Sequence, residues 1–381
     1  MSPFIETLFW LCLLLGLYPY ALYPCFAALA AQLFRRHVDR RQITPRTTVV
    51  ISAYNEARHI EATVRNKLQQ DYPQDLLDVM VVSDGSTDGT DEILQRLAAE
   101  SPRVKYWRQE PRQGKTAALN TLVERATGEI VVFADANSMY RPDTIRQLVM
   151  SFADPAVGYV SGMMIYVNPD GSMTGDGCSA YMRYENWLRA QETSIGSVVG
   201  VDGGVDAVRR KLYRPMQADQ LPDFVLPLDV VDQDHRVVFD PNAQLCEDTL
   251  TESAAEFRMR VRVSLRALWA LKSKANLLNP LRNAVFAWQL WSHKVLRYMS
   301  FLPLGVACLL NVVLAMLQPV YRVILVAQVF FWVAVWAGAR GSRVTAVRLA
   351  HYFALLNVAS AVAFGRFVRG RKQVLWQPRL G

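Results

Sequence analysis

The chain has 381 residues, 51% of them hydrophobic, and a formal net charge of +8 at pH 7. This length allows one sizeable soluble domain and a few membrane spans. Basic residues gather beside apolar runs, at residues 35–41 and 366–372, as they do in loops that flank membrane spans. Because no known nucleic-acid-binding motif accompanies this charge, the pattern favours a membrane protein and argues against a nucleic-acid partner. The five cysteines show no metal-ligand spacing and require no oxidising compartment.

The first predicted element is an apolar, uncharged run at residues 9–34, long enough to cross a hydrocarbon core of about 30 Å. Pro19 and Pro24 lie inside this run and are expected to kink it. Glu6 is the only charge before Arg35, so we interpret the run as a retained anchor and not as a cleaved signal peptide. The basic cluster that follows then places the middle of the chain on the cytoplasmic face of the membrane.

Residues 47–275 alternate strand and helix patterns. Strands are expected at residues 48–52, 79–82, 104–107 and 130–134, and helices at residues 57–70, 88–99, 115–125 and 142–152. Short, fully apolar strands separated by helices predict an α/β domain with a mostly parallel sheet covered on both faces. Ligands of such sheets bind at the carboxyl ends of the strands.

Beyond Pro280 the sequence becomes apolar again. An aromatic-rich segment at residues 284–296 is typical of an interfacial helix, and three further spans are expected at residues 301–317, 323–337 and 352–364. Simple alternation would place the basic tail outside, against the charge rule. Either the last segment re-enters or one assignment is wrong, so two to three spans stay open here.

The sequence predicts four domains. They are an anchor with its basic segment at residues 1–43, a cytoplasmic domain at residues 44–278, an interfacial helix at residues 279–298, and a membrane region with a basic tail at residues 299–381.

Polar residues follow two of the predicted strands at their carboxyl tips, within residues 49–56 and 81–89. The glycines of the second segment permit tight turns, and Thr87 or Asp88 can cap the next helix. Each segment alone is also compatible with a plain strand-to-helix turn.

Two more segments carry charged groups to the same edge of the predicted sheet. Residues 113–120 place Lys115 at a helix start directly after a glycine, where an ammonium group can counter phosphate charge. This is not a Walker A motif, because its upstream glycine spacing is absent. Residues 131–137 end a strand with Asp135 and Asn137. Taken singly, these are also compatible with a surface helix start and a structural strand-end acid.

In this order, the segments resemble the nucleotide-binding half of family 2 glycosyltransferases, the GT-A superfamily that includes cellulose, chitin and hyaluronan synthases. The resemblance covers roughly residues 45–270, and the flanking apolar runs extend it. It implies a GT-A (Rossmann-like) domain flanked by transmembrane helices, and a nucleotide-sugar donor, in particular a UDP-sugar.

The family's first two loops hold the uridine of the donor. Carried over, the resemblance assigns donor binding to Ala53, Tyr54 and Glu56 in the first loop and to Asp84 and Gly85 in the second. Glu56 would approach the ribose and Asp84 the uracil edge, whose N–H needs an acceptor. The family often has two acids before the glycine, whereas Ser83 stands at the first position here.

The segment with Lys115 resembles the family's Gly-Lys-x-x-Ala-Leu-Asn, which lines the donor site. The strand end with Asp135 resembles the Asp-x-Asp motif, which binds a divalent cation on the diphosphate. Asn137 replaces the second acid here. Both side chains offer oxygen to Mg²⁺ or Mn²⁺, although the lost charge should weaken the affinity.

The catalytic base of the family is an acid just before a helix. Residues 218–243 resemble this acidic motif, its helix and the strand that follows, and by that register the base is Asp223. The usual Glu-Asp pair is reduced to Pro222 and Asp223, which keeps the needed acid. Residues 247–248, Glu-Asp, are a rival by composition but follow the strand. Residues 202–204 resemble the acceptor-side loop in position only.

Processive members carry Gln-x-x-Arg-Trp after the base. Arg262 matches the arginine, which would stabilise the departing diphosphate, but Met259 replaces the glutamine and Val263 the tryptophan. These departures put long-chain processivity in doubt. The arginines at 258, 262 and 266 also fit a basic stripe on anionic lipid.

The resemblance therefore implies an inverting hexosyl- or N-acetylhexosaminyltransferase at the cytoplasmic membrane. Its acceptor would be a polysaccharide or surface glycan. Transfer of one sugar to a polyprenyl phosphate or other lipid is the alternative. A third reading, from another class, is an inactive nucleotide-sugar-binding membrane protein or a transporter. A transporter is expected to carry ionisable groups inside its spans, but the apolar runs here are nearly free of them. An inactive relative is expected to have lost the catalytic base, whereas Asp223 is present. The sequence identifies no protein partner.

Overall fold

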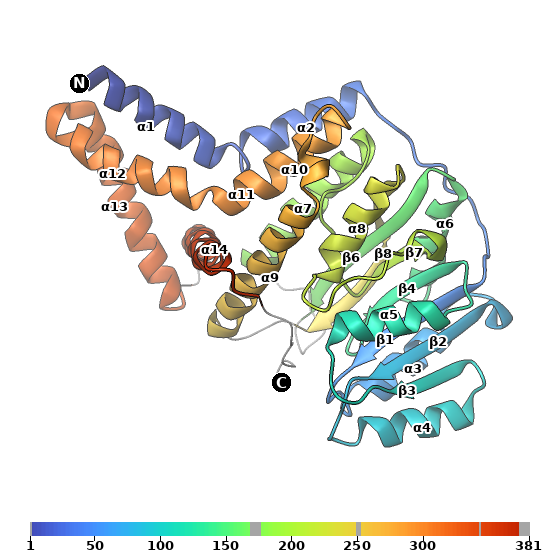
Figure 1. Ribbon diagram of the computed structural model, residues 1–381. Coiled ribbons are helices and arrows are strands. Elements are labelled where there is room, and N and C mark those ends of the chain that lie inside the picture. Colours follow the sequence, from blue (N-terminus) through green and yellow to red (C-terminus); the bar gives the residue numbers. More distant parts are fainter. Residues whose placement is uncertain (1, 168–176, 249–252, 343, 373–381) are drawn as a thin grey trace. The chain divides into compact units, whose positions relative to one another are not determined.

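The computed structural model describes residues 2–167, 177–248, 253–342 and 344–372 (Figure 1). By internal packing these residues form two compact units. The α/β unit comprises the described residues among 34–173 and 189–249. The helical unit comprises those among 1–33, 174–188 and 250–372.

One mixed sheet is the centre of the α/β unit, in the strand order β3-β2-β1-β4-β7-β6-β8-β5. Its strands are β1 (Thr47–Ala53), β2 (Leu77–Ser83), β3 (Val104–Arg108), β4 (Ile130–Asp135), β5 (Met139–Tyr140), β6 (Val157–Val167), β7 (Asp206–Arg209) and β8 (Arg236–Asp248). The first four strands pair in parallel, as predicted. In the second half of the sheet, β7 runs antiparallel to both β4 and β6, while β6 and β8 are parallel. The sheet is therefore fully parallel only in its first half, where apolar strands alternate with helices.

Helices cover this sheet, and most begin or end within a few residues of the prediction. They are α3 (Ile60–Leu68), α4 (Thr90–Glu100), α5 (Lys115–Arg125), α6 (Thr144–Met150), α8 (Pro222–Asp232) and the last turns of α7 (Gly177–Ile195), with short 3₁₀ turns at Gln74–Leu76, Ser151–Ala153 and Arg210–Leu212. The core is built from the aliphatic side chains of the central strands, such as Val49, Ile51 and Val132. Because these strands are apolar on both faces, burial on both sides follows from their sequence.

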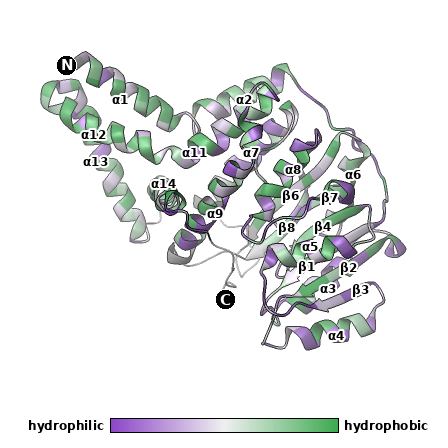
Figure 2. Ribbon diagram, viewed as in Figure 1, coloured by the Kyte–Doolittle hydropathy of each residue, from purple (hydrophilic) through white to green (hydrophobic). Residues whose placement is uncertain are grey.

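The helical unit contains the apolar ends of the chain, whose helices are mostly hydrophobic (green in Figure 2). Its helices are α1 (Ser2–Leu17), α2 (Leu22–Leu33), the first turns of α7, α9 (Ser253–Ser273), α10 (Ala284–Leu290), a π-helical turn (Trp291–Val295), α11 (Leu296–Met299), α12 (Phe301–Leu317), α13 (Pro319–Ala339) and α14 (Thr345–Val368), with a 3₁₀ turn at Ala275–Leu278. In the described part of the chain, α13 and α14 are long and apolar enough to cross a membrane. The number rises to four if each of two bent helix pairs, α1 with α2 and α10–α11 with α12, is one span.

The two prolines of the first apolar run behave differently. The axes of α1 and α2 differ by 56° at the break that contains Pro19, so the kink predicted there is confirmed. Pro24 lies in the first turn of α2, where a proline costs no hydrogen bond. The kink predicted at Pro24 is therefore wrong.

Helix α9 packs on α14 through Val261, Leu265, Ala359 and Ala363. Packing thus groups residues 253–273 with the candidate spans, whereas the sequence placed them in the domain at residues 44–278. The segment predicted as interfacial is helical from Ala284 to Met299, and its place at a bilayer surface stays a prediction.

Candidate functional site

The carboxyl ends of β1, β2 and β4 meet at one edge of the sheet. Ala53 pairs with Ser83 across β1 and β2, and Ser52 pairs with Asp135 across β1 and β4. The amide of Asp84 donates to the carbonyl of Ala53 at 2.8 Å. The motifs predicted to bind the donor are therefore neighbours in space.

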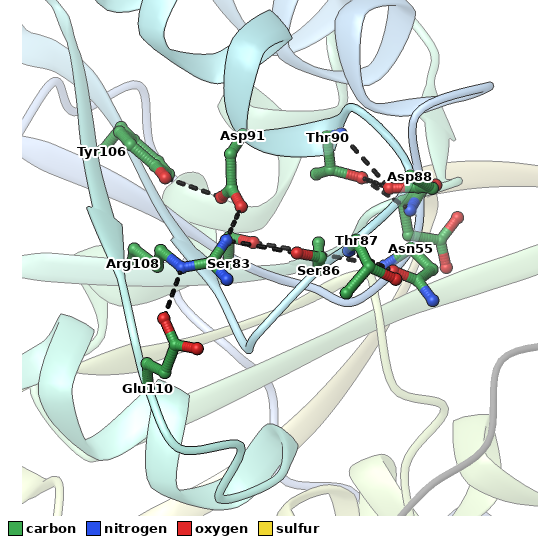
Figure 3. A network of polar contacts seen from close by, with 11 residues as sticks. Asn55, Ser83, Ser86, Thr87, Asp88, Thr90, Asp91, Tyr106, Arg108 and Glu110 are labelled. Carbon is green, nitrogen blue, oxygen red and sulfur yellow. Dashed lines mark hydrogen bonds and ion pairs between the residues drawn. The ribbon is translucent and has the colours of Figure 1, made fainter.

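Two loops at this edge, residues 54–57 and 83–90, bind each other through backbone and side-chain hydrogen bonds; we term them the paired loops. The amide of Asn55 donates to Ser86 Oγ (3.0 Å), and the amide of Thr87 donates to Asn55 Oδ1 (2.9 Å) (Figure 3). The amide of Glu56 donates to Thr90 Oγ1 at 2.9 Å. Asn55 has a φ of 55°, a left-handed conformation that asparagine tolerates. These bonds join the two loops, and α3 starts at Ile60, three residues later than predicted.

Asp88 joins the paired loops in a way that the sequence did not predict. Gly89 is the N-cap residue of α4 and makes no side-chain cap, so neither Thr87 nor Asp88 occupies the cap position. The Asp88 carboxylate instead accepts from the amides of Ala57 (3.0 Å) and Thr90 (3.2 Å). Bonds to these backbone donors and to the Thr90 hydroxyl outweigh burial and lower the pKa of Asp88.

Asp84 is 1% exposed and accepts hydrogen bonds from the loop before α5. Its carboxylate accepts hydrogen bonds from Gln109 Nε2 (2.7 Å) and from the backbone amides of Gln113 (2.8 Å) and Gly114 (2.9 Å). The following Gly85 has a φ of 72°, so the turn needs a residue without a Cβ. Asp84 thus shapes the segment that leads to Lys115; contact with a nucleobase stays a prediction.

Arg112, which no sequence pattern predicted as a site residue, lies over the first of the paired loops. The Arg112 guanidinium carbon is 3.5 Å from the centroid of the Tyr54 ring, a cation–π contact. Arg112 Nε is also 3.4 Å from Asp84 Oδ2. No motif spacing marks this residue, because its loop position is fixed only when the sheet brings Tyr54 and Asp84 together.

Lys115 starts α5 and reaches Asp135 at the end of β4. Its Nζ is 2.6 Å from Asp135 Oδ1. Burial lowers the pKa of Lys115, but the carboxylates of Asp135 and Asp223 outweigh it and hold that pKa above its ordinary value. The lysine is therefore a permanent cation at neutral pH.

Helix α5 also positions Asp223. The Thr116 hydroxyl donates to the Gln220 carbonyl (3.0 Å), and Asn120 Nδ2 donates to the Met216 carbonyl (2.7 Å). These bonds fix the segment that enters α8, whose first turn contains Asp223. Gly203 packs against the acid, since a Cβ there would lie 2.5 Å from Asp223 Oδ2.

Lys115, Asp135 and Asp223 line one small cavity of about 10 Å³, together with a fourth charged residue, Asp206; we term this the acid cavity. Asp135 and Asp223, which the sequence analysis assigns to metal binding and to base catalysis, therefore line the same cavity. Asp84 is connected to it through the Gly114 amide and the adjacent Lys115.

Asp206 was not singled out in the sequence. It is the first residue of β7, pairs with Phe133 of β4, and accepts a hydrogen bond from the Tyr159 hydroxyl. Burial and the nearby Asp223 carboxylate raise the pKa of Asp206 well above its ordinary value. An aspartate at a strand start carries no motif signal, although an acid inside the apolar run at residues 205–208 is unusual.

The donor set at the end of β4 fits a hard divalent cation. Asp135 offers a carboxylate and Asn137 an amide oxygen, and Mg²⁺ is commonly held by one or two such side chains together with substrate phosphates. Among the residues that the structure describes, no group of three or more His, Cys, Asp or Glu side chains is arranged to hold a metal. With two oxygen atoms from the protein, a bound ion would be completed by the phosphates of a ligand.

The remaining predicted residues lie elsewhere in the chain. Arg262 is on α9, in the helical unit, and its catalytic role stays a prediction. The rival base pair, residues 247–248, forms the end of β8, and its side chains lie outside the described residues.

Comparison with known proteins bears on this site. Residues 48–212 match the family model described as Glycosyl transferase family 2. Beta-monoglucosyldiacylglycerol synthase of Nostoc sp. is 29% identical over 169 residues, which are 44% of this chain and 36% of that protein. Hyaluronan synthase of Pasteurella multocida is 32% identical over 142 residues, 37% of this chain and 14% of that protein. The matches thus span about a third or less of these relatives' lengths.

A solved structure extends the fold match over almost the whole chain. The mannosyltransferase PcManGT from Pyrobaculum calidifontis, in complex with GDP-Man and Mn²⁺, aligns with a TM-score of 0.74. The alignment covers 96% of this chain and 99% of that one at 22% identity. The predicted GT-A fold is therefore confirmed.

Proposed function

Because residues 48–212 match the model of Glycosyl transferase family 2 and the chain has the GT-A fold, we propose that it transfers a sugar from a UDP-sugar to a membrane-associated acceptor with inversion. The observation that supports this is the acid cavity, where Lys115, Asp135 and Asp223 meet at the carboxyl edge of the sheet. One cation and two separated carboxylates match the three needs of the reaction, which are leaving-group stabilisation, donor binding and proton removal.

Asp223 acts as the general base. It takes the proton of the acceptor hydroxyl as that oxygen attacks the anomeric carbon, a role worth about 10²–10⁴-fold in rate. A single displacement inverts the configuration. Its position in the first turn of α8 favours the ionised form, because the N-terminal end of a helix stabilises negative charge.

The diphosphate lies on the opposite side of the reacting carbon. Lys115, already a cation beside Asp135, offsets the charge that develops on the leaving nucleotide. Arg262 adds a second positive charge in this proposal. The paired loops, with Tyr54, Glu56 and Gly85, hold the nucleoside, and Ala53 and Asp84 fix their geometry.

Asp135 and Asn137 would hold a divalent cation, Mg²⁺ or Mn²⁺, on the diphosphate. Such an ion polarises the leaving group when it is bound. The solved mannosyltransferase complex is described as containing Mn²⁺, which supports a divalent cation in this proposal. Activity that survives complete chelation by EDTA would argue against the ion.

The acceptor is a polysaccharide or surface glycan, or a lipid that receives one sugar. The lipid acceptor is favoured by the Nostoc relative, whose name is that of a glucosyldiacylglycerol synthase, and by the departures at Met259 and Val263. The candidate spans support a reaction at a membrane for either acceptor, and the charge pattern supports the cytoplasmic face.

The test is incubation of membranes that contain the protein with a panel of labelled UDP- and GDP-sugars. Product size and extraction into organic solvent then separate polymer from lipid-linked sugar. Membranes with an Asp223→Asn variant are the control for background enzymes. Absence of transfer from every donor in the panel would contradict the proposed function.

A further inference from the structure

Asp206 is a buried acid that the reaction described above does not use. It is 2% exposed and lies between β4 and β6 in the sheet, opposite Phe133 and Ser161. Its side chain lines the acid cavity with Asp223 and Lys115. A carboxylate placed this deep requires a partner for each oxygen, because an unpaired buried acceptor is destabilising.

Among the described residues, one of its two oxygens has a hydrogen-bond partner and the other has none. The Tyr159 hydroxyl, itself buried, donates to Oδ2, and Oδ1 makes no hydrogen bond with any residue that the structure describes. Tyr159 therefore fixes the orientation of the acid and leaves Oδ1 for the cavity. Unsatisfied buried oxygens of this kind are expected where a ligand completes the site.

The space beside Asp206 fits one oxygen atom of a ligand. The cavity of about 10 Å³ is close to the space that a single water molecule needs, and a sugar hydroxyl fills the same space. The described residues form no three-ligand metal group here, and Lys115 is already paired with Asp135. A hydroxyl group both donates and accepts, so it can bind a carboxyl oxygen in either protonation state.

The identity of that hydroxyl follows from the neighbours of Asp206. In the proposed reaction the anomeric carbon lies between the diphosphate near Lys115 and the base Asp223, so a hydroxyl group on the ring of the transferred sugar can reach the cavity. We propose that Asp206 is a specificity-determining residue whose Oδ1 hydrogen-bonds to one ring hydroxyl of the transferred sugar. This rests on the proposed function and deepens it.

The consequence is selection among donors that differ at one carbon. A site built to hydrogen-bond a substrate hydroxyl can reject the analogue without it by about 10⁴–10⁵-fold, because the protein group is then left unpaired. A donor with the opposite configuration at that carbon would also leave Oδ1 without its partner. Removal of Asp206 would erase this selection and leave nucleotide binding untouched.

The test measures equilibrium binding of nucleotides and nucleotide sugars to the full chain in detergent. The probes are UDP, the UDP-sugar that wild type binds best from the panel, and four analogues of that sugar, each lacking one hydroxyl group. We expect wild type to lose at least 100-fold in affinity for one analogue. In Asp206→Leu that loss should fall at least tenfold, while the losses for the other analogues and the affinity for UDP stay as in wild type.

Two further variants keep the test decisive. The pair Tyr159→Phe and Asp206→Leu in one chain removes both members of the buried bond, so it leaves no orphaned partner if the single variant folds poorly. Tyr159→Phe alone keeps the carboxyl group but removes the bond that orients it, so its loss of selection should be smaller than that of Asp206→Leu. An unchanged pattern of losses in the Asp206 variants, or equal weakening of UDP and every sugar, would overturn the assignment.

Failure of the inference and failure of the proposed function look different. If wild type binds neither UDP nor any nucleotide sugar in the panel, the proposed function fails. If wild type binds a nucleotide sugar and the Asp206 variants discriminate as it does, only the assignment of Asp206 fails.

Discussion

The paired loops and the acid cavity lie at the same edge of one sheet, yet they differ in how their polar groups are satisfied. In the paired loops, Asn55, Asp88 and Thr90 are bound to backbone amides of the opposite loop. In the acid cavity, Asp206 keeps an oxygen without a partner in the described chain, and three carboxylates surround one lysine. The first region is therefore shaped by its own hydrogen bonds, whereas the second keeps bonding capacity that a substrate can use.

The largest effect is expected at the base. Asp223→Asn should lower the transfer rate by about 10²–10⁴-fold, because the amide cannot take the acceptor proton. UDP affinity should stay within about twofold of wild type, since the paired loops do not depend on Asp223. Transfer would be followed with the labelled donor and UDP binding by calorimetry. Near-wild-type transfer by this variant would remove Asp223 as the base.

A smaller loss is expected from Gly203→Ala, which leaves every acid in place. The new methyl group would lie 2.5 Å from Asp223 Oδ2, so the carboxylate must move. A misplacement of about 1 Å can cost on the order of 10²-fold in rate, so we expect a 10- to 100-fold loss of kcat with little change in UDP affinity.

Gly196→Ala is the matched control for this variant. A Cβ at Gly196 meets no atom within 4 Å among the described residues, so its activity should equal that of wild type. Equal activity of the Gly203 and Gly196 variants would contradict this prediction. It would mean that the reaction does not depend on the exact position of the Asp223 carboxylate.

The paired loops should respond in stability and nucleotide affinity together. In wild type the two carboxylate oxygens of Asp84 accept from the amides of Gln113 and Gly114. In Asp84→Asn one of these oxygens becomes an NH₂ group, which cannot accept, so the free energy of unfolding should fall by about 1–3 kcal/mol. We expect a lower midpoint of thermal unfolding and weaker UDP binding.

Asp71→Asn is the control for this change. Asp71 forms an ion pair with Arg146 in which both side chains are well exposed, so its loss should have almost no effect. Unchanged unfolding and UDP binding in Asp84→Asn would mean that the loop before α5 holds its shape without the carboxylate.

The sequence predicted the first half of the α/β unit well because the signals there are local. Lys115–Arg125 was placed to the residue, and β1 to β4 within two residues, since each is a short apolar or helical run with turns at its ends. The donor-side loops followed from their motifs. The second half was predicted less fully, because β6 and β7 are set by their pairing with β4 and β8, far apart in the chain. Asp206 and Arg112 were missed for the same reason: what makes each of them notable is a neighbour more than 40 residues away in sequence.

The smallest effect concerns the pH dependence of stability, and it tests whether the buried acid of the cavity differs electrostatically from an ordinary surface carboxylate. Because the pKa of Asp206 is raised in the folded state, folding binds its proton more tightly than the unfolded chain does. Its contribution to stability is therefore complete below the ordinary aspartate pKa and is lost as pH rises through the raised value. Asp206→Asn cannot ionise and lacks this loss, so its stability relative to wild type should increase with pH, by up to about 1.4 kcal/mol per pH unit within that window. Unfolding midpoints of both proteins between pH 4 and pH 9, with Asp71→Asn as the surface control, measure the difference. If the two curves stay parallel across that range, Asp206 ionises as easily in the folded protein as in the unfolded chain, and the acid cavity compensates the third carboxylate without a substrate.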